Sequence, residues 1–236
     1  SLDFGAGTDT LALSDVTTGL ADADFANVTA TTLTNIVLAA NTANTVVLGS
    51  SAKTAGVVSI VASGSGIDTI TLHDGVTNVD ADAGNDIITI PAAGLEAAPT
   101  IDGGLGTDTL ILSDATTGLV DADFANVTLV PALTLAANTA NTVVLGSAAA
   151  TAGLTTVTAS GTGNDAITIP TEIVTLDLDA GDDTVTTTAA IAESLDSGGH
   201  TWDFGAGTDT LALSDVTTGL VDNDFHAQIT AGTLTN

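Results

Sequence analysis

The chain contains no cysteine, no methionine and no tyrosine, and Lys53 is its single basic residue. Without cysteine it can form neither a disulfide nor a thiolate metal site. With one Lys and no Arg, it lacks the positive surface that binds nucleic-acid phosphates and anionic membranes. No apolar run reaches the length of a transmembrane helix. The sequence therefore excludes nucleic acid as a partner and predicts no insertion into a membrane.

Acidic residues are abundant, and almost all of them are aspartate. The 236 residues include 26 Asp and 3 Glu, and the formal net charge is −28. Hydrophobic residues make up 44% of the chain, which is enough for a folded core. Aspartate favours turns and Ca²⁺ loops, whereas glutamate favours helices. A folded chain this acidic repels itself, so we expect cations to neutralise it.

A glycine-rich loop that ends in aspartate and runs into a short apolar strand recurs along the chain. The loop residues that end the motif are Asp9, Asp68, Asp86, Asp108, Asp165, Asp183 and Asp209. Further aspartates open the same loops: Asp3, Asp80, Asp82, Asp102, Asp177, Asp179 and Asp203. Glycine permits the tight turn, aspartate offers carboxylate oxygens to a hard cation, and the alternating apolar residues predict a β-strand with one buried face.

The motif lies within two nested repeats. Super-repeats of about 100 residues cover 3–101, 102–202 and, in part, 203–236, and residues 41–50 return unchanged at 138–147. Inside them, the motif aspartates are separated by 18 to 26 residues. This spacing predicts an all-β fold, an elongated β-solenoid with coils of about 18–26 residues. We expect one continuous solenoid over residues 1–236, with the four prolines at coil corners.

Each coil shows apolar residues in alternation after its aspartate, and these should point inward and stack. The predicted pairs are Leu11/Leu13, Val46/Leu48, Ile70/Leu72, Ile88/Ile90, Leu110/Leu112, Val143/Leu145, Ile167/Ile169 and Leu211/Leu213. Phe25, Phe124 and Phe225 should be buried anchors of acidic corners. The Ala-rich segments 49–56 and 146–153 are predicted as wide loops or single helical turns.

The motif resembles the nonapeptide G-G-x-G-x-D-x-U-x of RTX proteins, in which U is apolar. Residues 103–111 match every position, and residues 161–168 match all but the first glycine. The longer pattern resembles β-strand repeats of very large bacterial secreted proteins, among them RTX-type surface-layer proteins and giant adhesins. The resemblance implies that the seven aspartates that end the motif supply Ca²⁺ ligands, together with loop carbonyls. The seven aspartates that open the same loops could complete the ligand shell. This chain departs from the family pattern, because the family motif recurs every nine residues and the motif here recurs every 18 to 26. The wider spacing implies a ladder of ions on one flank of the solenoid, or a coil wider than that of the family.

A structural alternative remains open at the sequence level. The aspartates could cap their turns through Asx hydrogen bonds, and Asn44 and Asn141 show that the same slot accepts a neutral side chain. For Asp22/Asp24, Asp121/Asp123 and Asp222/Asp224, calcium binding and capping are equally open.

Catalysis finds little support in the residues. His73, His200 and His226 occur in unrelated contexts, and we interpret them as surface loop residues. Paired aspartates can hydrolyse glycosidic bonds, but here they recur in every repeat, whereas an active site normally occurs once. We therefore expect a protein that is not an enzyme.

The function predicted from the sequence is structural: a Ca²⁺-stabilised repeat rod at the cell surface, in a surface layer, an extracellular filament or an adhesin stalk. The expected partners are copies of itself or a tandem continuation of the same polypeptide, because the chain opens within a motif. The alternative is a ligand-binding or ice-binding face made by outward threonines.

Overall fold

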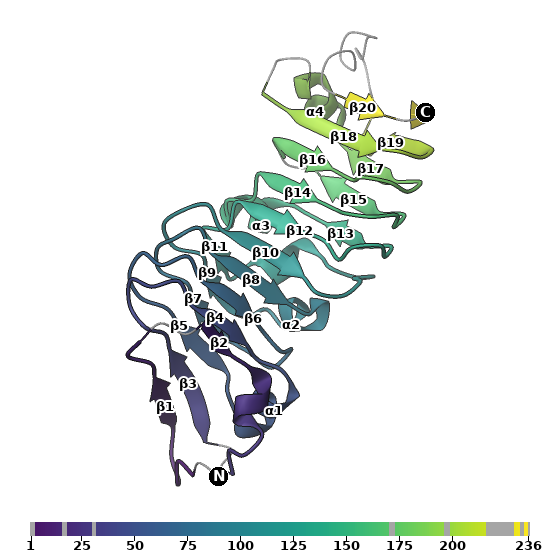
Figure 1. Cartoon of the computed structure of the whole chain (residues 1–236). Helices are drawn as coiled ribbons and strands as arrows, with labels where there is room; N and C mark the ends of the chain where they lie inside the picture. Colours follow the sequence, from purple (N-terminus) through teal and green to yellow (C-terminus); the bar gives the residue numbers. More distant parts are fainter. Residues whose placement is uncertain are drawn as a thin grey trace. The chain divides into compact units, whose positions relative to one another are not determined.

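The computed structural model describes residues 3–15, 18–29, 32–169, 173–195, 199–215, 229–231 and 234–235. Most of its regular structure consists of β-strands of two to five residues, joined by loops and a few short helices (Figure 1). The strand pairings recorded among these residues are parallel. The prediction of a β protein is therefore confirmed. The chain divides into two compact units, Ser1–Ile111 with Asn126–Val130, and Leu112–Ala125 with Pro131–Asn236.

The first unit contains two parallel sheets. One sheet has the order β1 (Asp9–Ala12), β3 (Leu33–Val37), β5 (Ser59–Val61), β7 (Asn78–Asp80), β9 (Thr100–Asp102), β11 (Val127–Thr128). The other has the order β2 (Thr18–Leu20), β4 (Thr45–Val47), β6 (Thr69–Thr71), β8 (Ile87–Ile90), β10 (Thr109–Leu112). The helices are the 3₁₀ turn η1 (Asp22–Phe25), α1 (Ser50–Ala55) and α2 (Ala92–Glu96).

The second unit repeats this plan. One sheet has the order β12 (Ala132–Thr134), β14 (Thr156–Thr158), β16 (Thr175–Asp177), β18 (Thr201–Gly205), β20 (Ile229–Ala231). The other has the order β13 (Thr142–Val144), β15 (Ala166–Ile169), β17 (Thr184–Thr187), β19 (Asp209–Leu213), β21 (Leu234–Thr235). Its helices are η2 (Asp121–Phe124), α3 (Ser147–Thr151) and α4 (Ala189–Ser194). The two Ala-rich segments thus form α1 and α3, which selects the helical turn over the wide loop.

Within each unit, consecutive strands alternate between the two sheets, and each strand pairs with the next but one. Val46 lies beside Ile70, and Ile70 beside Ile88. Motif aspartates that are hydrogen-bonded to each other in neighbouring strands lie 18 to 26 residues apart in the sequence. The shortest separation is between Asp68 and Asp86, and the longest is between Asp183 and Asp209. The strand register therefore follows the spacing of the motif aspartates.

The core is a set of aliphatic columns. Val46, Ile70 and Ile88 are fully buried in the even-numbered sheet, as their alternation predicts. A second column, from Ile36 through Ile60, lies on β3 and β5 of the odd-numbered sheet, two strands that no glycine–aspartate loop precedes. Each buried aliphatic side chain contributes about 1.5–3 kcal/mol. Phe25 and Phe124 are buried as predicted, whereas Phe225 and Pro170 lie outside the described residues.

One super-repeat contains an odd number of strands. A strand and its equivalent in the next super-repeat therefore lie in different sheets. Asp9 and Asp108 end equivalent motifs in the sequence, and β1 and β10 follow them. Yet β1 belongs to the odd-numbered sheet and β10 to the even-numbered sheet, because nine strand steps separate them. Equivalent residues of successive super-repeats therefore belong to different sheets.

No helix among the described residues is both long enough and apolar enough to cross a membrane.

Candidate functional site: a buried aspartate ladder

Three motif aspartates of the first unit lie at the starts of β6, β8 and β10. Asp68, Asp86 and Asp108 each come directly before the first strand residue and are at most 3% exposed. The glycine-rich loops turn the chain into these strands, and the parallel register then stacks one aspartate over the next. The sequence-predicted residues are thus brought together, inside the protein.

Hydrogen bonds join these aspartates from layer to layer. The backbone N–H of Asp68 donates to Oδ1 of Asp86 at 2.6 Å, and the N–H of Asp86 donates to Oδ1 of Asp108 at 2.8 Å. The first rung is Asn44, whose backbone N–H and Nδ2 donate to Oδ1 of Asp68 at 2.7 and 2.9 Å. We call this series the aspartate ladder. Each carboxylate in it accepts the backbone N–H of the residue at the same place in the preceding layer.

The second unit has the same ladder. Asn141 donates from its backbone N–H and from Nδ2 to Oδ1 of Asp165, both at 2.8 Å. The N–H of Asp165 donates to Asp183 at 2.7 Å, and the N–H of Asp183 donates to Asp209 at 3.1 Å. Two copies with the same rungs show that this arrangement is a property of the repeat.

In three ladder aspartates the second carboxylate oxygen lacks a described partner. Oδ2 of Asp86, Asp108 and Asp183 is buried and has no hydrogen-bond partner among the residues that the structure describes. Burial, aided by the charge of Asp108, raises the pKa of Asp86 to about 6, and the hydrogen bond from the N–H of Asp68 opposes this shift. Burial likewise raises the pKa of Asp183 to about 6. A buried carboxylate oxygen without a partner favours a proton or a cation.

The pKa values of the outer rungs shift in the same direction. Burial raises the pKa of Asp68 and Asp165, opposed by their hydrogen bonds from Asn44 and Asn141. Burial also raises the pKa of Asp108, opposed by the N–H of Asp86. Burial in these layers therefore disfavours the ionised form of Asp68, Asp86, Asp108, Asp165 and Asp183.

Glycines let the loops before the ladder approach each other closely. A Cβ placed on Gly106 would overlap the carbonyl oxygen of Gly84, and one placed on Gly104 would overlap that of Asp82. Both glycines also have positive φ, at +144° and +81°. Carbonyl oxygens of one loop thus lie directly beneath the backbone of the next.

The aspartates that open the loops make local turns at or near the surface. Oδ1 of Asp80 accepts the N–H of Asp82 at 3.2 Å, and Oδ1 of Asp102 accepts the N–H of Gly104 at 3.1 Å. Such Asx contacts also occur at Asp3, Asp177 and Asp203. In addition, Oδ2 of Asp82 accepts the N–H of Gly64, and Oδ2 of Asp179 that of Gly161.

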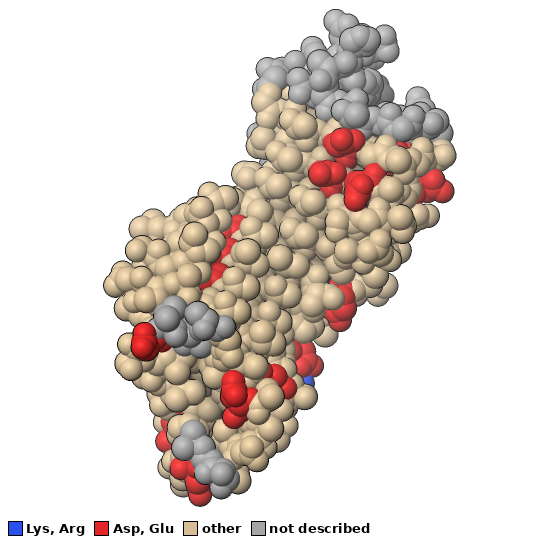
Figure 2. Space-filling model, viewed as in Figure 1, with Lys and Arg blue, Asp and Glu red and all other residues tan. Residues whose placement is uncertain are grey.

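Asp9 lies apart from the ladder of its unit. It pairs with Leu33, and its N–H donates to the carbonyl of Thr32 at 2.9 Å. Among the described residues, no three His, Asp or Glu side chains lie close enough together to form a metal-binding group. Figure 2 shows acidic side chains as several separate patches on the face in view.

Asp22 has a role that the sequence left open. Its carboxylate accepts the N–H groups of Gly49, Ser51 and Ala52 at 2.7, 3.1 and 2.9 Å, so it caps α1 from the preceding layer. Burial would raise its pKa, but these three N–H groups outweigh burial and hold the pKa below its ordinary value. Asp121 makes the equivalent contacts with Ala148 and Ala149.

The other members of these acidic pairs close the 3₁₀ turns. Asp24 accepts the N–H of Ala21 at 2.9 Å, and Asp123 accepts that of Val120 at 2.8 Å. Capping thus accounts for the described members of both pairs, whereas Asp222 and Asp224 lie outside the described residues. Because the capped N–H groups of Asp22 lie 27 to 30 residues away, no local sequence signal could reveal them.

The prediction that the histidines lie on the surface is wrong for two of them. His73 and His200 are each only 6% exposed. Burial lowers the pKa of His73, and its Nδ1 accepts the N–H of Gly75 at 3.0 Å. The neutral ring therefore packs in the interior as part of a turn. His226 lies outside the described residues.

No family model, curated protein or solved structure matches this chain.

Proposed function

We propose that this protein is an extracellular structural protein, a β-solenoid rod stiffened by Ca²⁺, in a surface layer, a filament or the stalk of an adhesin. The observation that carries the proposal is the aspartate ladder, which occurs in both units with the same rungs. Its hydrogen bonds run from each layer to the next, so the repeated polar residues serve cohesion along the stack. The proposal takes each pair of consecutive strands as one coil of 18–26 residues.

Calcium follows from the electrostatics of the ladder. Neighbouring strands of a sheet lie about 4.8 Å apart, so ionised ladder aspartates repel one another. A hard cation bound at Oδ2 of Asp86, Asp108 or Asp183 would convert that repulsion into attraction, and nearby loop carbonyls would be further oxygen ligands. The proposed ligands remain Asp3, Asp9, Asp68, Asp80, Asp82, Asp86, Asp102, Asp108, Asp165, Asp177, Asp179, Asp183, Asp203 and Asp209.

The proposed location and partners follow from the charge and the repeats. With a net charge of −28, the folded chain would be weakly stable where Ca²⁺ is scarce and most stable outside the cell, where Ca²⁺ reaches millimolar levels. The near-identity of residues 3–25 and 203–225 supports tandem continuation or self-association along the stack. The same charge argues against nucleic acid as a partner.

The test is thermal unfolding followed by circular dichroism, with the protein stripped of metal and then returned to millimolar Ca²⁺. We expect the β spectrum to weaken on stripping and to recover with Ca²⁺ but not with the same concentration of Na⁺. An unchanged spectrum and midpoint after stripping would remove calcium from the proposal.

A second candidate, an ice-binding or ligand-binding face, is favoured by one observation. The register aligns outward threonines in rows, such as Thr156, Thr175 and Thr201 on β14, β16 and β18. Equal spacing of hydroxyls along such a row could order water or a repeating ligand. However, Asp177 and Asp203 interrupt the neighbouring row, which begins with Thr158. Thermal hysteresis of the pure protein would decide this candidate, and its absence would exclude ice binding.

A further inference from the structure

The turns after η1 and η2 carry the same four residues, Ala-Asn-Val-Thr. Of the twelve asparagines in the chain, Asn27 and Asn126 alone are followed by Thr or Ser two positions later. Asn-x-Thr without an intervening proline is the acceptor sequence of N-linked glycosylation, and it must be displayed on the surface. Both asparagines are exposed.

We propose that Asn27 is a glycan acceptor and that Asn126 is a poorer one. The inference rests on the proposed function, because the sugar donor is met during export. In the reaction, Nδ2 of Asn27 bonds to the anomeric carbon of a lipid-linked saccharide. The bond from that carbon to the lipid phosphate breaks, the phosphate carries away the electron pair, and Nδ2 loses one proton. No oxidant or reductant is required.

The two asparagines differ in what holds the side-chain nitrogen. Nδ2 of Asn126 donates to the carbonyl oxygen of Ala98 at 3.1 Å, so a glycan there must displace or crowd this contact. The carbonyl of Asn126 also accepts the N–H of Ile101 at 3.0 Å, which fixes its backbone. The side chain of Asn27 makes no hydrogen bond to any residue that the structure describes. The acceptor nitrogen of Asn27 is therefore the more accessible of the two.

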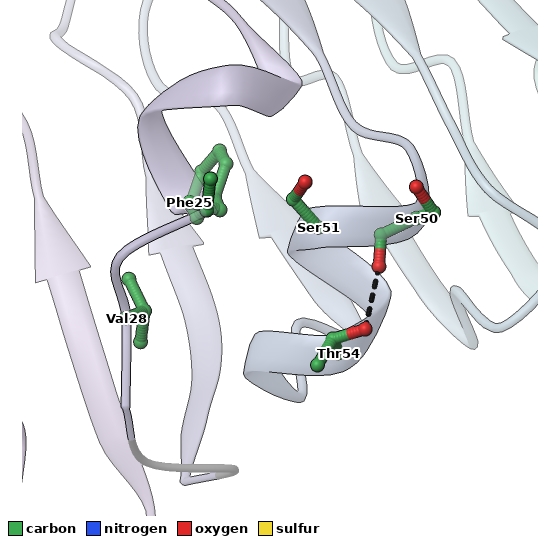
Figure 3. Close-up of a pocket in the computed structure, with 6 residues that line it drawn as sticks. Phe25, Val28, Ser50, Ser51 and Thr54 are labelled. Atoms are coloured by element: carbon green, nitrogen blue, oxygen red, sulfur yellow. Dashed lines mark hydrogen bonds between the residues drawn. The ribbon is translucent and has the colours of Figure 1, made fainter.

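A hollow beside Asn27 can receive the first sugar. It has a volume of about 230 Å³ and is lined by Phe25, Ala26, Val28, Ser50, Ser51 and Thr54 (Figure 3). Both chain neighbours of Asn27 border it, so the acceptor lies at its edge. Hydroxyl groups from α1 line one side, and Phe25 and Val28 line the other. A sugar ring has the same combination of hydroxyl edges and apolar C–H faces.

Thr54 is already oriented within this hollow, because its hydroxyl donates to the carbonyl of Ser50 at 2.8 Å. Its oxygen keeps lone pairs that can accept a hydrogen bond from a sugar hydroxyl. The geometry thus offers a fixed acceptor next to the attachment point.

The test is glycopeptide mass spectrometry on the chain recovered from the surface of the cells that produce it. We expect a saccharide mass on the peptide that contains Asn27, and lower occupancy at Asn126. The mass should disappear in Asn27→Gln and in Thr29→Ala, which keeps the asparagine but removes the acceptor sequence. Thr29→Ser preserves the acceptor sequence and is the matched control, so the saccharide should remain.

Each contrary outcome has a distinct meaning. An exported chain with unmodified Asn27, or a saccharide that survives Thr29→Ala, would overturn the glycan proposal alone. Equal occupancy at Asn27 and Asn126 would overturn the assigned preference. Retention of the chain inside the cell would overturn the proposed function and the glycan proposal together.

Discussion

Asp86 in the ladder and Asp22 beneath α1 are the same side chain in opposite electrostatic situations. Asp22 distributes its negative charge over three backbone N–H groups. Asp86 receives one backbone N–H on Oδ1 and has no described partner for Oδ2. The pKa of Asp22 is consequently lowered, whereas burial raises that of Asp86 to about 6.

The difference shows which aspartates the polypeptide satisfies by itself. At Asp22 the fold supplies enough donors to stabilise the anion, so no ion is needed. At Asp86, and at Asp183 in the second unit, the anion lacks donors and faces other carboxylates. The carboxyl groups of Asp86 and Asp183 are therefore fully satisfied only when they hold a proton or a cation. The predictions below vary pH, charge and donors to separate these two situations.

The largest effect is expected from pH in the absence of metal ions. The folded-state pKa values of Asp86 and Asp183 are about 6, above the ordinary value of 3.8. The folded state therefore holds protons that the unfolded state releases, and stability falls as pH rises from about 4 to about 6. Discounted for solvent screening, each rung should cost about 1–3 kcal/mol of unfolding free energy. Unfolding midpoints in metal-free buffers measure this slope.

Asp22 should change stability with pH in the opposite direction. Because its folded-state pKa is lowered, its contribution to stability is present above about pH 3.8 and is lost in stronger acid. The metal-free profile should therefore have a maximum near pH 4. Stability that increases steadily from pH 4 to pH 7 would contradict the ladder pKa values.

The next largest effect is expected from Asp86→Asn, for which calcium should reverse the order of stability between variant and parent. Asparagine keeps an acceptor for the N–H of Asp68 and removes the charge, as Asn44 does at the first rung. Without metal at pH 7 the variant should be about 1–3 kcal/mol more stable than the parent chain. In millimolar Ca²⁺ the parent should become the more stable of the two, because it alone retains the ligand.

The control for this variant is Asp86→Ala, which removes the charge and the acceptor together. It leaves the buried N–H of Asp68 without its partner, so it should be about 1–3 kcal/mol less stable than Asp86→Asn in either buffer. Equal stability of the two variants would show that the hydrogen bond contributes little. If Ca²⁺ failed to reverse the order of parent and Asp86→Asn, the ladder would be a capping device without ions.

A smaller effect is expected at the contrasting site. Asp22→Ala removes the acceptor for three N–H groups at the start of α1 and should cost about 1–2 kcal/mol, with no dependence on Ca²⁺. Asp24→Ala is the matched control, because Asp24 lies in the same turn and, among the described residues, accepts one N–H group, that of Ala21. Denaturant midpoints with and without Ca²⁺ measure both. A calcium-dependent loss at Asp22 would show that the cap also binds the ion.

Local patterns predicted well the strands that follow a glycine–aspartate loop, such as β6 and β8. The alternation of Ile70 with Leu72 and of Ile88 with Ile90 depends only on neighbouring residues, and all four side chains are buried. The column through Ile36 and Ile60 was missed because no glycine–aspartate loop precedes its strands. Burial there is set by pairing across 24 residues, which the register fixes and the local sequence does not.

The membership of the ladder was predictable, but its chemistry was not. Regular spacing brought Asp68, Asp86 and Asp108 to the same place in successive layers, as expected. That Oδ1 of each would accept the N–H of the rung before it depends on loop stacking at atomic distance. Asp9 shows a further limit of the sequence pattern. Its motif is equivalent to that of Asp108, yet nine strand steps separate β1 from β10 and place them in different sheets.

The smallest effect is expected at Asp82, a loop aspartate near the surface. Its Oδ2 accepts the N–H of Gly64, and its φ is +62°, a conformation that asparagine also tolerates. Asp82→Asn keeps both features, so without metal its unfolding free energy should lie within about 0.5 kcal/mol of the parent. If Asp82 is a Ca²⁺ ligand as well, the variant should need more Ca²⁺ to reach the same unfolding midpoint. An unchanged calcium titration would confine the ions to the ladder, because the loop carboxylate would then act through its N–H contact alone.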